Sequence, residues 1–234
     1  MDIAGFRKTS LIDYPGQIAA VVFTQGCNFR CPYCHNPELI EFTSDKEFMD
    51  PDFLWDFLKQ RNELLDGVVI TGGEPTLQED IIDFIKKIRS RGLKVKLDTN
   101  GSVFRVMETI VRDNLVDYVA LDIKGAFADY PEIAGIKNPD HIDNVRQSMQ
   151  LLVSSDITCE LRTTVVPGYH DSAQIEKIAG QISGSGRYVL QNFRPGKTLD
   201  PDLQEKSRFS EEKIYSFQEK VQKRTTNLEV EVKD

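Results

Sequence analysis

The sequence predicts an open, curved α/β barrel, with a parallel sheet inside and helices outside. Short apolar runs of strand length alternate along the chain with segments whose apolar residues recur at helical spacing. Such alternation is typical of a parallel sheet covered by helices. About six strand–helix units can be counted, too few to close a standard eight-stranded barrel. We therefore expect a partial (β/α)6 barrel, and a doubly wound open sheet is the alternative that periodicity leaves open.

The composition fits one domain over residues 1–234, with a lead-in at 1–17, a core at about 18–195, and a C-terminal helix and edge strand at about 196–234. The chain has 40% hydrophobic and 28% charged residues, as expected of a protein with a real core. Its net charge of -8 argues against a nucleic-acid partner. It shows neither an apolar run of ~18 residues nor a signal sequence, so we expect a cytoplasmic protein without membrane contact.

The first half of the chain gives three strands and two helices after the lead-in. The apolar run at 18–24 predicts a strand that is buried on both faces and ends before Gly26. Asp50 and Pro51 supply an N-cap and a first-turn proline. The predicted elements are a helix from Asp50 to Gly67, a strand at 68–71, a helix from Ile81 to Gly92 and a strand at 94–97.

The second half continues the alternation and ends at an edge strand. The predicted elements are a helix at 103–113, a strand at 116–121, a helix at 142–152, a strand at 157–166, a helix at 175–182 and a strand at 188–190. Residues 196–208 are polar without periodicity and predict a loop. Ser210 caps a last helix, and the alternating residues 228–232 predict the edge strand.

Three cysteines follow the first strand at C-x3-C-x2-C spacing: Cys27, Cys31 and Cys34. Thiolates are soft ligands that suit iron–sulfur clusters, zinc or copper. An odd trio without a signal sequence indicates a reducing compartment rather than disulfides. Zinc would need a fourth ligand, and His35 directly follows Cys34, so both would reach one ion only with strain. The pattern favours a cluster, with zinc as the alternative, and Cys159 is interpreted as a core residue.

Polar and glycine residues collect where the other predicted strands end. Active sites of barrels lie at the carboxyl ends of their strands, so topology brings these segments to one rim. Glycines let a ligand approach the backbone, carboxylates accept from ammonium or ribose groups, and cationic side chains pair with carboxylates. Each segment alone is a weak signal, since Asn-Gly is also a favoured turn. The residues are Gly72, Gly73, Glu74, Asp98, Asp122, Lys124, Arg162, Thr164 and Gln191.

Residues 24–37, followed by Gly72-Gly73-Glu74-Pro75, resemble the glycyl-radical-enzyme activases of the radical S-adenosylmethionine (SAM) superfamily. The lead-in at 5–16 is similar to activating proteins of the anaerobic ribonucleoside-triphosphate reductase. Residues 98–101, 122–124 and 165–168 are similar to segments of pyruvate formate-lyase activating enzyme. The resemblance covers about residues 5–196 and is most specific at the cysteines.

The resemblance implies one [4Fe-4S] cluster on the three cysteines, with SAM on the fourth iron. Four cysteines in the whole chain leave no ligands for further clusters. A reduced flavodoxin or ferredoxin would supply an electron. SAM would be cleaved to methionine and a 5'-deoxyadenosyl radical, which would abstract hydrogen from a glycine of the partner reductase. The implied SAM contacts are Tyr33, Gly72, Gly73, Glu74, Asp98, Asp122, Lys124, Arg162 and Thr164, with a monovalent cation near Asp98 and Asp122.

The sequence also allows two other enzymatic functions and one non-enzymatic function. The partner could be another glycyl-radical enzyme of the pyruvate formate-lyase type. A radical SAM enzyme acting on a small molecule would need its own substrate pocket, whereas an activase needs an open barrel mouth that admits a peptide loop. A zinc-binding or electron-transfer module is the non-enzymatic alternative.

Overall fold

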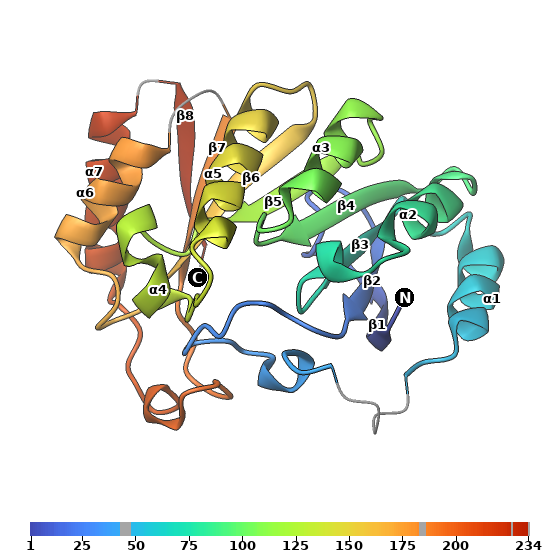
Figure 1. Ribbon diagram of the computed structural model, residues 1–234, viewed down its shortest axis with the longest axis horizontal. Coiled ribbons are helices and arrows are strands. Elements are labelled where there is room, and N and C mark those ends of the chain that lie inside the picture. The colour runs from blue at the N-terminus through green and yellow to red at the C-terminus, as the bar shows by residue number, and fades with distance from the viewer. Residues whose placement is uncertain (43–47, 183–185, 226, 234) are drawn as a thin grey trace.

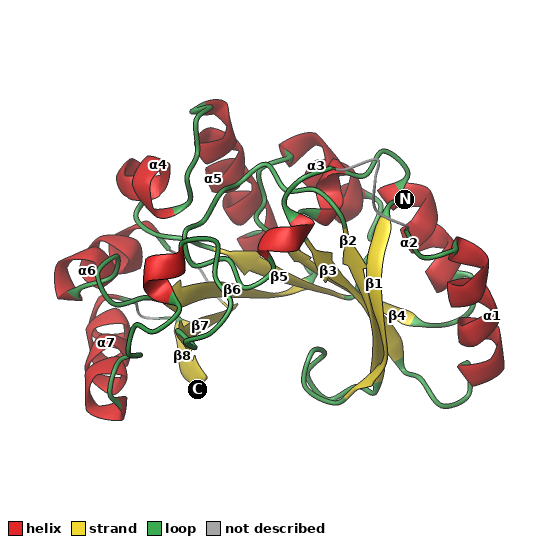
Figure 2. Ribbon diagram, turned by 90° about the horizontal axis from the view of Figure 1, so that it is seen from below, coloured by secondary structure: helices red, strands yellow, loops and turns green. Residues whose placement is uncertain are grey.

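One curved sheet of eight strands runs through the molecule, and the helices cover its convex side (Figures 1 and 2). The computed structural model describes residues 1–42, 48–182, 186–225 and 227–233. The strands are β1 (Ile3–Ser10), β2 (Ala19–Thr24), β3 (Gly67–Gly72), β4 (Lys94–Thr99), β5 (Tyr118–Asp122), β6 (Thr158–Val165), β7 (Gly186–Asn192) and β8 (Leu228–Lys233). Their order in the sheet is their order in the chain.

The sheet is parallel from β2 to β8, and only β1 runs antiparallel to its neighbour. Because the strand order never reverses, the doubly wound alternative is wrong. Among the strands that the structure describes, the two at the ends of the sheet, β1 and β8, do not pair with each other, so the barrel is open. The predicted partial barrel with outer helices is confirmed.

Seven α-helices and four single-turn 3₁₀ helices connect the described strands. The α-helices are α1 (Pro51–Arg61), α2 (Ile81–Arg89), α3 (Phe104–Arg112), α4 (Tyr130–Ile133), α5 (Asp140–Val153), α6 (Ser172–Gln181) and α7 (Glu211–Arg224). The 3₁₀ helices are η1 (Pro37–Leu39), η2 (Pro75–Leu77), η3 (Phe127–Asp129) and η4 (Pro201–Leu203). The predicted caps form: the side chains of Asp50 and Ser210 accept hydrogen bonds from the backbone N–H groups of Asp52 and Lys213.

The structure differs from the predicted elements at β1, at the end of α1, at α4 and at η4. The lead-in forms strand β1, whose residues 6–9 show no alternating apolar pattern because they lie at the sheet's edge. Helix α1 ends at Arg61 rather than near Gly67, and Leu65 enters the core after a turn. The short helix α4 lies in a connection too brief to show periodicity, and η4 lies within the predicted loop at 196–208.

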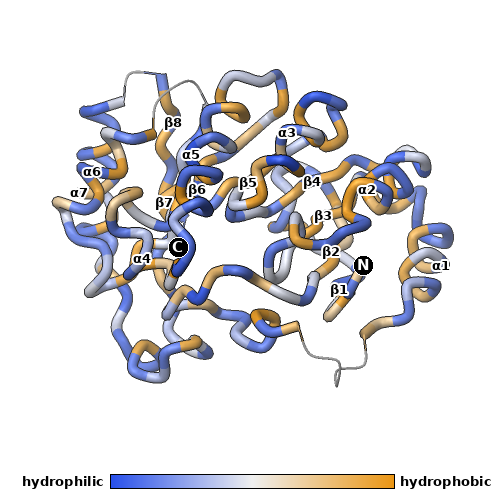
Figure 3. The backbone as a smooth tube through the Cα atoms, viewed as in Figure 1, coloured by the Kyte–Doolittle hydropathy of each residue, from blue (hydrophilic) through white to orange (hydrophobic). Residues whose placement is uncertain are grey.

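The two faces of the sheet differ in chemistry. The convex face and the helices form the main apolar core, which includes Ile70, Leu97 and Leu121. In Figure 3, hydrophobic (orange) stretches occur along the strands of the sheet. On the concave face, Val21 of β2 and Val69 of β3 form a smaller apolar cluster with Tyr14 and Tyr118. Charged side chains follow from β4 onward, so they enter the interior of the partial barrel.

None of the helices in the described parts of the chain combines the length and the apolar character needed to cross a bilayer.

Candidate active site

The cysteine loop, residues 25–36, lies across the carboxyl ends of the strands and is held there by other loops. The N–H of Arg30 donates to the carbonyl of Ala134 beyond α4 (3.0 Å), and the N–H of Asp200 donates to the carbonyl of Pro32 (2.8 Å). The amide of Asn28 donates to Ser102 Oγ (2.8 Å). These hydrogen bonds come from three different connections, so the protein itself fixes the loop's course.

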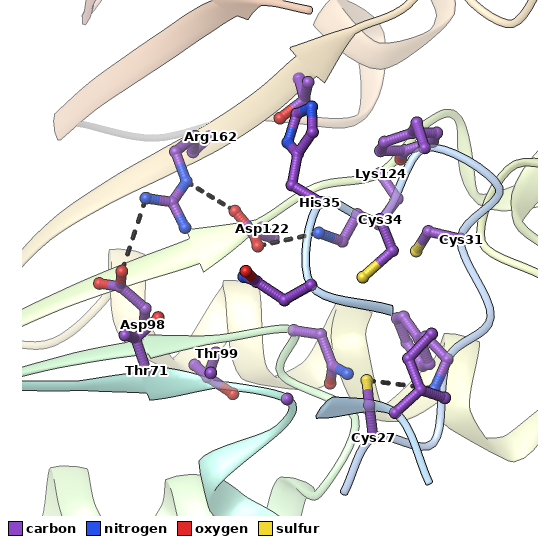
Figure 4. A pocket seen from close by; sticks show the side chains of 18 of the residues that line it. Cys27, Cys31, Cys34, His35, Thr71, Asp98, Thr99, Asp122, Lys124 and Arg162 are labelled. Atoms are coloured by element: carbon purple, nitrogen blue, oxygen red, sulfur yellow. Dashed lines mark hydrogen bonds and ion pairs between the residues drawn. The ribbon is translucent and has the colours of Figure 1, made fainter. Parts of the chain in front are cut away.

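A cavity of about 280 Å³ lies between this loop and the strand ends (Figure 4). Except for Glu74, every residue predicted to contact the cluster or SAM lines it. The lining residues are Cys27, Phe29, Cys31, Tyr33, Cys34, His35, Asn36, Ile40, Thr71, Gly72, Gly73, Asp98, Thr99, Asn100, Asp122, Lys124, Arg162, Thr164 and Gln191. The hydroxyl of Tyr33 is buried and has no hydrogen-bond partner among the described residues, so it is available to a ligand.

The carboxylate of Glu74 connects two loops instead of facing the cavity. It is fully buried and accepts hydrogen bonds from the N–H of Asn100 (2.7 Å), Thr99 Oγ1 (2.7 Å) and the N–H of Thr76 (3.0 Å). Burial raises the pKa of Glu74, and these hydrogen bonds act against that shift. Glu74 thus holds the loop after β3 against the loop after β4, and its contact with SAM stays a prediction.

Five charged side chains form a chain of ion pairs along β4, β5 and β6. Lys124 Nζ donates to Asp122 Oδ2 (2.9 Å), and Arg162 Nε donates to Asp122 Oδ1 (2.7 Å), so Asp122 lies between two cations (Figure 4). Arg162 Nη1 lies 3.7 Å from Asp98 Oδ2, and Asp98 also pairs with Lys96. Three cations against two anions leave a surplus positive charge beside the cavity.

These contacts keep the members of the chain ionised. Burial alone would raise the pKa of Asp122, but the charges of Arg162 and Lys124 outweigh it, and the pKa lies well below the usual range. Burial likewise opposes the charged form of Lys124, and the carboxylate of Asp122 more than offsets it, so the pKa of Lys124 is raised. A carboxylate ligand would therefore meet a permanently cationic lysine.

The three thiols of the loop are free; Cys31 is buried, and Cys27 and Cys34 are half-buried. Burial raises the pKa of Cys27 to about 12 and that of Cys31 to about 11, and it also raises the pKa of Cys34. The charge of Lys124 acts in the opposite direction on all three. A metal must therefore displace protons from these thiols when it binds.

A family model places this geometry in a known context. The model of the radical SAM superfamily matches residues 21–180, which include the cysteine loop and the loops after β3, β4 and β5. The chain belongs to the radical SAM superfamily. It is accordingly a radical SAM enzyme, and membership implies a [4Fe-4S] cluster and SAM as its cofactors.

This radical SAM enzyme is similar to several named proteins. A Methanocaldococcus jannaschii protein, provisionally named glycyl-radical enzyme activating enzyme MJ1227, is 35% identical over 209 residues, which is 86% of this chain and 83% of that one. The pyruvate formate-lyase-activating enzyme of Clostridium pasteurianum is 31% identical over 210 residues, 87% and 85% of the two chains. Streptococcus suis SuiB, solved with bound S-adenosylmethionine, shares the fold at a TM-score of 0.68 and 16% identity, covering 90% of this chain and 48% of SuiB.

The donor set of this radical SAM enzyme fits a cluster better than a single zinc ion. The ring of His35 stacks on Phe193 (5.6 Å between centroids), and its Nε2 lies 2.9 Å from the carbonyl of Arg194. His35, the fourth zinc ligand considered from the sequence, is thus engaged away from the three thiols. Cys159 lies in β6, outside the cavity and near the carbonyl of Leu152.

Sequence reasoning missed three residues that support this radical SAM site. Lys96 stands two positions before Asp98, a spacing that places both side chains on one face of a strand and could have indicated the pair. Tyr130 and His170 hydrogen-bond the backbone of Lys124. No local pattern marked either residue, because each reaches the site from a different connection.

Proposed function

We propose that this radical SAM enzyme generates the glycyl radical of an anaerobic ribonucleoside-triphosphate reductase. The observation that carries the proposal is similarity over more than four-fifths of both chains to proteins named as glycyl-radical enzyme and pyruvate formate-lyase activating enzymes. A cavity lined by three thiols at the rim of an open sheet supports it. The resemblance of residues 5–16 favours the reductase as the partner.

The bound cluster and SAM would supply a 5'-deoxyadenosyl radical, through one-electron reduction that breaks the S–C5' bond and releases methionine. Residues of this chain bind the cluster and SAM. Cys27, Cys31 and Cys34 hold the cluster, and Lys124 with Arg162 pairs with the SAM carboxylate. The backbone at 72–73 accepts from the SAM ammonium group, and Asp98 accepts from a ribose hydroxyl. The 5'-deoxyadenosyl radical would then abstract a hydrogen atom from the partner's glycine.

An anaerobic electron paramagnetic resonance experiment tests the proposal. Reconstituted, reduced enzyme is mixed with SAM and the anaerobic reductase of the same source. A glycyl-radical doublet that requires both SAM and the reductase is expected. If 5'-deoxyadenosine forms without a doublet, the radical chemistry stands and the reductase is the wrong partner. A doublet on pyruvate formate-lyase instead would favour the second candidate, which the similarity to the Clostridium pasteurianum enzyme supports.

Reduced flavodoxin or ferredoxin is the proposed electron donor. The measurement is 5'-deoxyadenosine formation with each reduced protein in turn, compared with a chemical reductant. If neither protein supports turnover while the chemical reductant does, the donor proposal is wrong and the SAM chemistry is unaffected.

The monovalent cation beside Asp98 and Asp122 stays a prediction. Lys96, Lys124 and Arg162 already pair with these carboxylates, so a cation would need further oxygen ligands, such as the SAM carboxylate. Titrating KCl into enzyme kept in a tetramethylammonium buffer tests it. SAM affinity that does not respond to potassium would count against the cation.

A further inference from the structure

Two fully buried side chains hold the peptide groups on either side of Lys124. The N–H of Lys124 donates to the hydroxyl of Tyr130 (3.0 Å), and its carbonyl lies 2.8 Å from Nε2 of His170. Tyr130 is 0% and His170 is 1% exposed. One partner comes from α4 and the other from the connection between β6 and α6, so both lie outside the loop after β5 that carries Lys124.

The contacts of His170 determine where its proton lies. The N–H of Val166 donates to Nδ1 (3.1 Å), so Nδ1 is the acceptor and the proton is on Nε2. Nε2 therefore donates to the carbonyl of Lys124. The neutral imidazole thus links the end of β6 to the loop after β5 and uses both of its nitrogens.

Neighbouring residues restrict the backbone at residues 124–125. A Cβ on Gly125, the next residue, would come within 2.5 Å of Ile133, so the backbone passes tightly beneath α4. The rings of His170 and Tyr33 are also neighbours (6.4 Å between centroids), which brings the His170 loop against the cysteine loop. The backbone of Lys124 is consequently fixed relative to the cavity that its side chain lines.

We propose that His170 and Tyr130 are positioning residues that hold the Lys124 peptide and thereby aim its ammonium group at the SAM carboxylate. The inference rests on the proposed function, because it takes SAM as the ligand of Lys124. A lysine side chain has four rotatable bonds, so its aim depends on a fixed backbone and on Asp122. Asp122 fixes the ammonium end, and His170 and Tyr130 fix the backbone end.

Two substitutions at position 170 separate the two hydrogen bonds of the imidazole. The amide nitrogen of Gln reaches the place of Nε2, so His170→Gln retains the donor to Lys124. The side chain of Asn ends near the place of Nδ1, so His170→Asn retains the contact with Val166 and loses the donor. We expect His170→Gln to bind SAM nearly as wild type does and His170→Asn to bind about tenfold more weakly, as for one lost hydrogen bond to a buried carbonyl.

The measurements are SAM affinity by anaerobic calorimetry and iron content per chain. Hydrogen–deuterium exchange at the Lys124 amide is an independent readout, and Tyr130→Phe should accelerate it because the acceptor is lost. Equal SAM affinity in His170→Gln and His170→Asn, at equal iron content, would overturn the proposal. An unchanged exchange rate in Tyr130→Phe would overturn the part that concerns Tyr130.

A double-mutant cycle tests whether His170 acts through Lys124. In a Lys124→Met background, the loss caused by His170→Asn should largely disappear, since no ammonium group is left to aim. A purely structural role would instead give the same tenfold loss in both backgrounds, which would overturn the proposal. Failure of the proposed function looks different: wild-type enzyme would then give no glycyl-radical doublet on the reductase, whatever the SAM affinities of the position-170 variants.

Discussion

At the scale of single residues, the site depends on which cysteines face the cavity. Cys27, Cys31 and Cys34 line it, whereas Cys159 lies in β6 away from it. We expect the rate of SAM cleavage to fall at least about a hundredfold in Cys31→Ala. This is more than the usual loss when a residue that only supports a metal ligand is removed. Cys159→Ala is the matched control and should cleave SAM normally. Iron content and 5'-deoxyadenosine yield measure both, and normal turnover of Cys31→Ala would contradict the cluster assignment.

The neutral state of His170 makes stability depend on pH. Burial lowers the pKa of His170, which disfavours its charged form in the folded protein. The stabilisation by a group with a lowered folded-state pKa is present above its unfolded pKa of about 6.5 and is lost as pH falls. Between pH 7.5 and 5.5, the free energy of unfolding of wild type should therefore fall relative to that of His170→Gln.

The limiting slope of this difference is about 1.4 kcal/mol per pH unit, reached where His170 is protonated in the unfolded chain alone. Urea unfolding of both proteins at several pH values, followed by circular dichroism, provides the comparison. If the free energies of unfolding of wild type and His170→Gln change in parallel over this pH range, His170 does not titrate differently in the folded and unfolded states.

At the scale of elements, the ends of β2 and β3 set the floor of the cavity. A Cβ on Gly73 would lie 2.1 Å from the carbonyl oxygen of Gly26, so the loops after these strands touch backbone to backbone. Gly73→Ala should separate them, destabilise the protein by about 1–3 kcal/mol and weaken SAM binding, because overpacking shifts the backbone.

Gly92→Ala is the control for Gly73→Ala. Gly92 has a positive φ of 78° but open space around it, so its substitution costs about 1 kcal/mol and should leave SAM affinity unchanged. SAM affinity by calorimetry and urea unfolding distinguish the two variants. Equal SAM affinities would mean that the approach of Gly73 to Gly26 does not shape the cavity.

The strands show which parts of the fold a sequence can predict. Central strands such as β2 and β3 are apolar on both faces and short, so their local pattern was sufficient. Strand β1 was missed because it depends on pairing with β2, which no local pattern records. The cysteine spacing predicted the thiol side of the cavity. The roles of Lys96, Tyr130 and His170 depend on contacts across strands and connections, which only the fold creates.

At the scale of the whole molecule, the protein itself holds the cysteine loop in place. Phe29, Cys31 and Tyr33 belong to the main apolar core. The loop also makes backbone and side-chain hydrogen bonds to Ala134, Ser102 and Asp200. We expect removal of iron with a chelator to leave the circular dichroism spectrum and the cooperative unfolding transition nearly unchanged. Hydrogen–deuterium exchange at the N–H of Arg30 should remain slow after the iron is removed. Collapse of the transition on iron removal would show that the cluster holds the fold together.

Under the proposed function, the open flank between β1 and β8 should affect the yield of the reaction. Among the described residues, no strand closes the sheet, so the chain alone does not complete a wall around its interior. If the proposed function holds, the partner protein must then exclude water and reductant from the site during turnover. Without a partner, SAM would be cleaved, but the 5'-deoxyadenosyl radical would be quenched without forming a glycyl radical. The number of 5'-deoxyadenosine molecules released per glycyl radical should accordingly fall towards one as the partner approaches saturation.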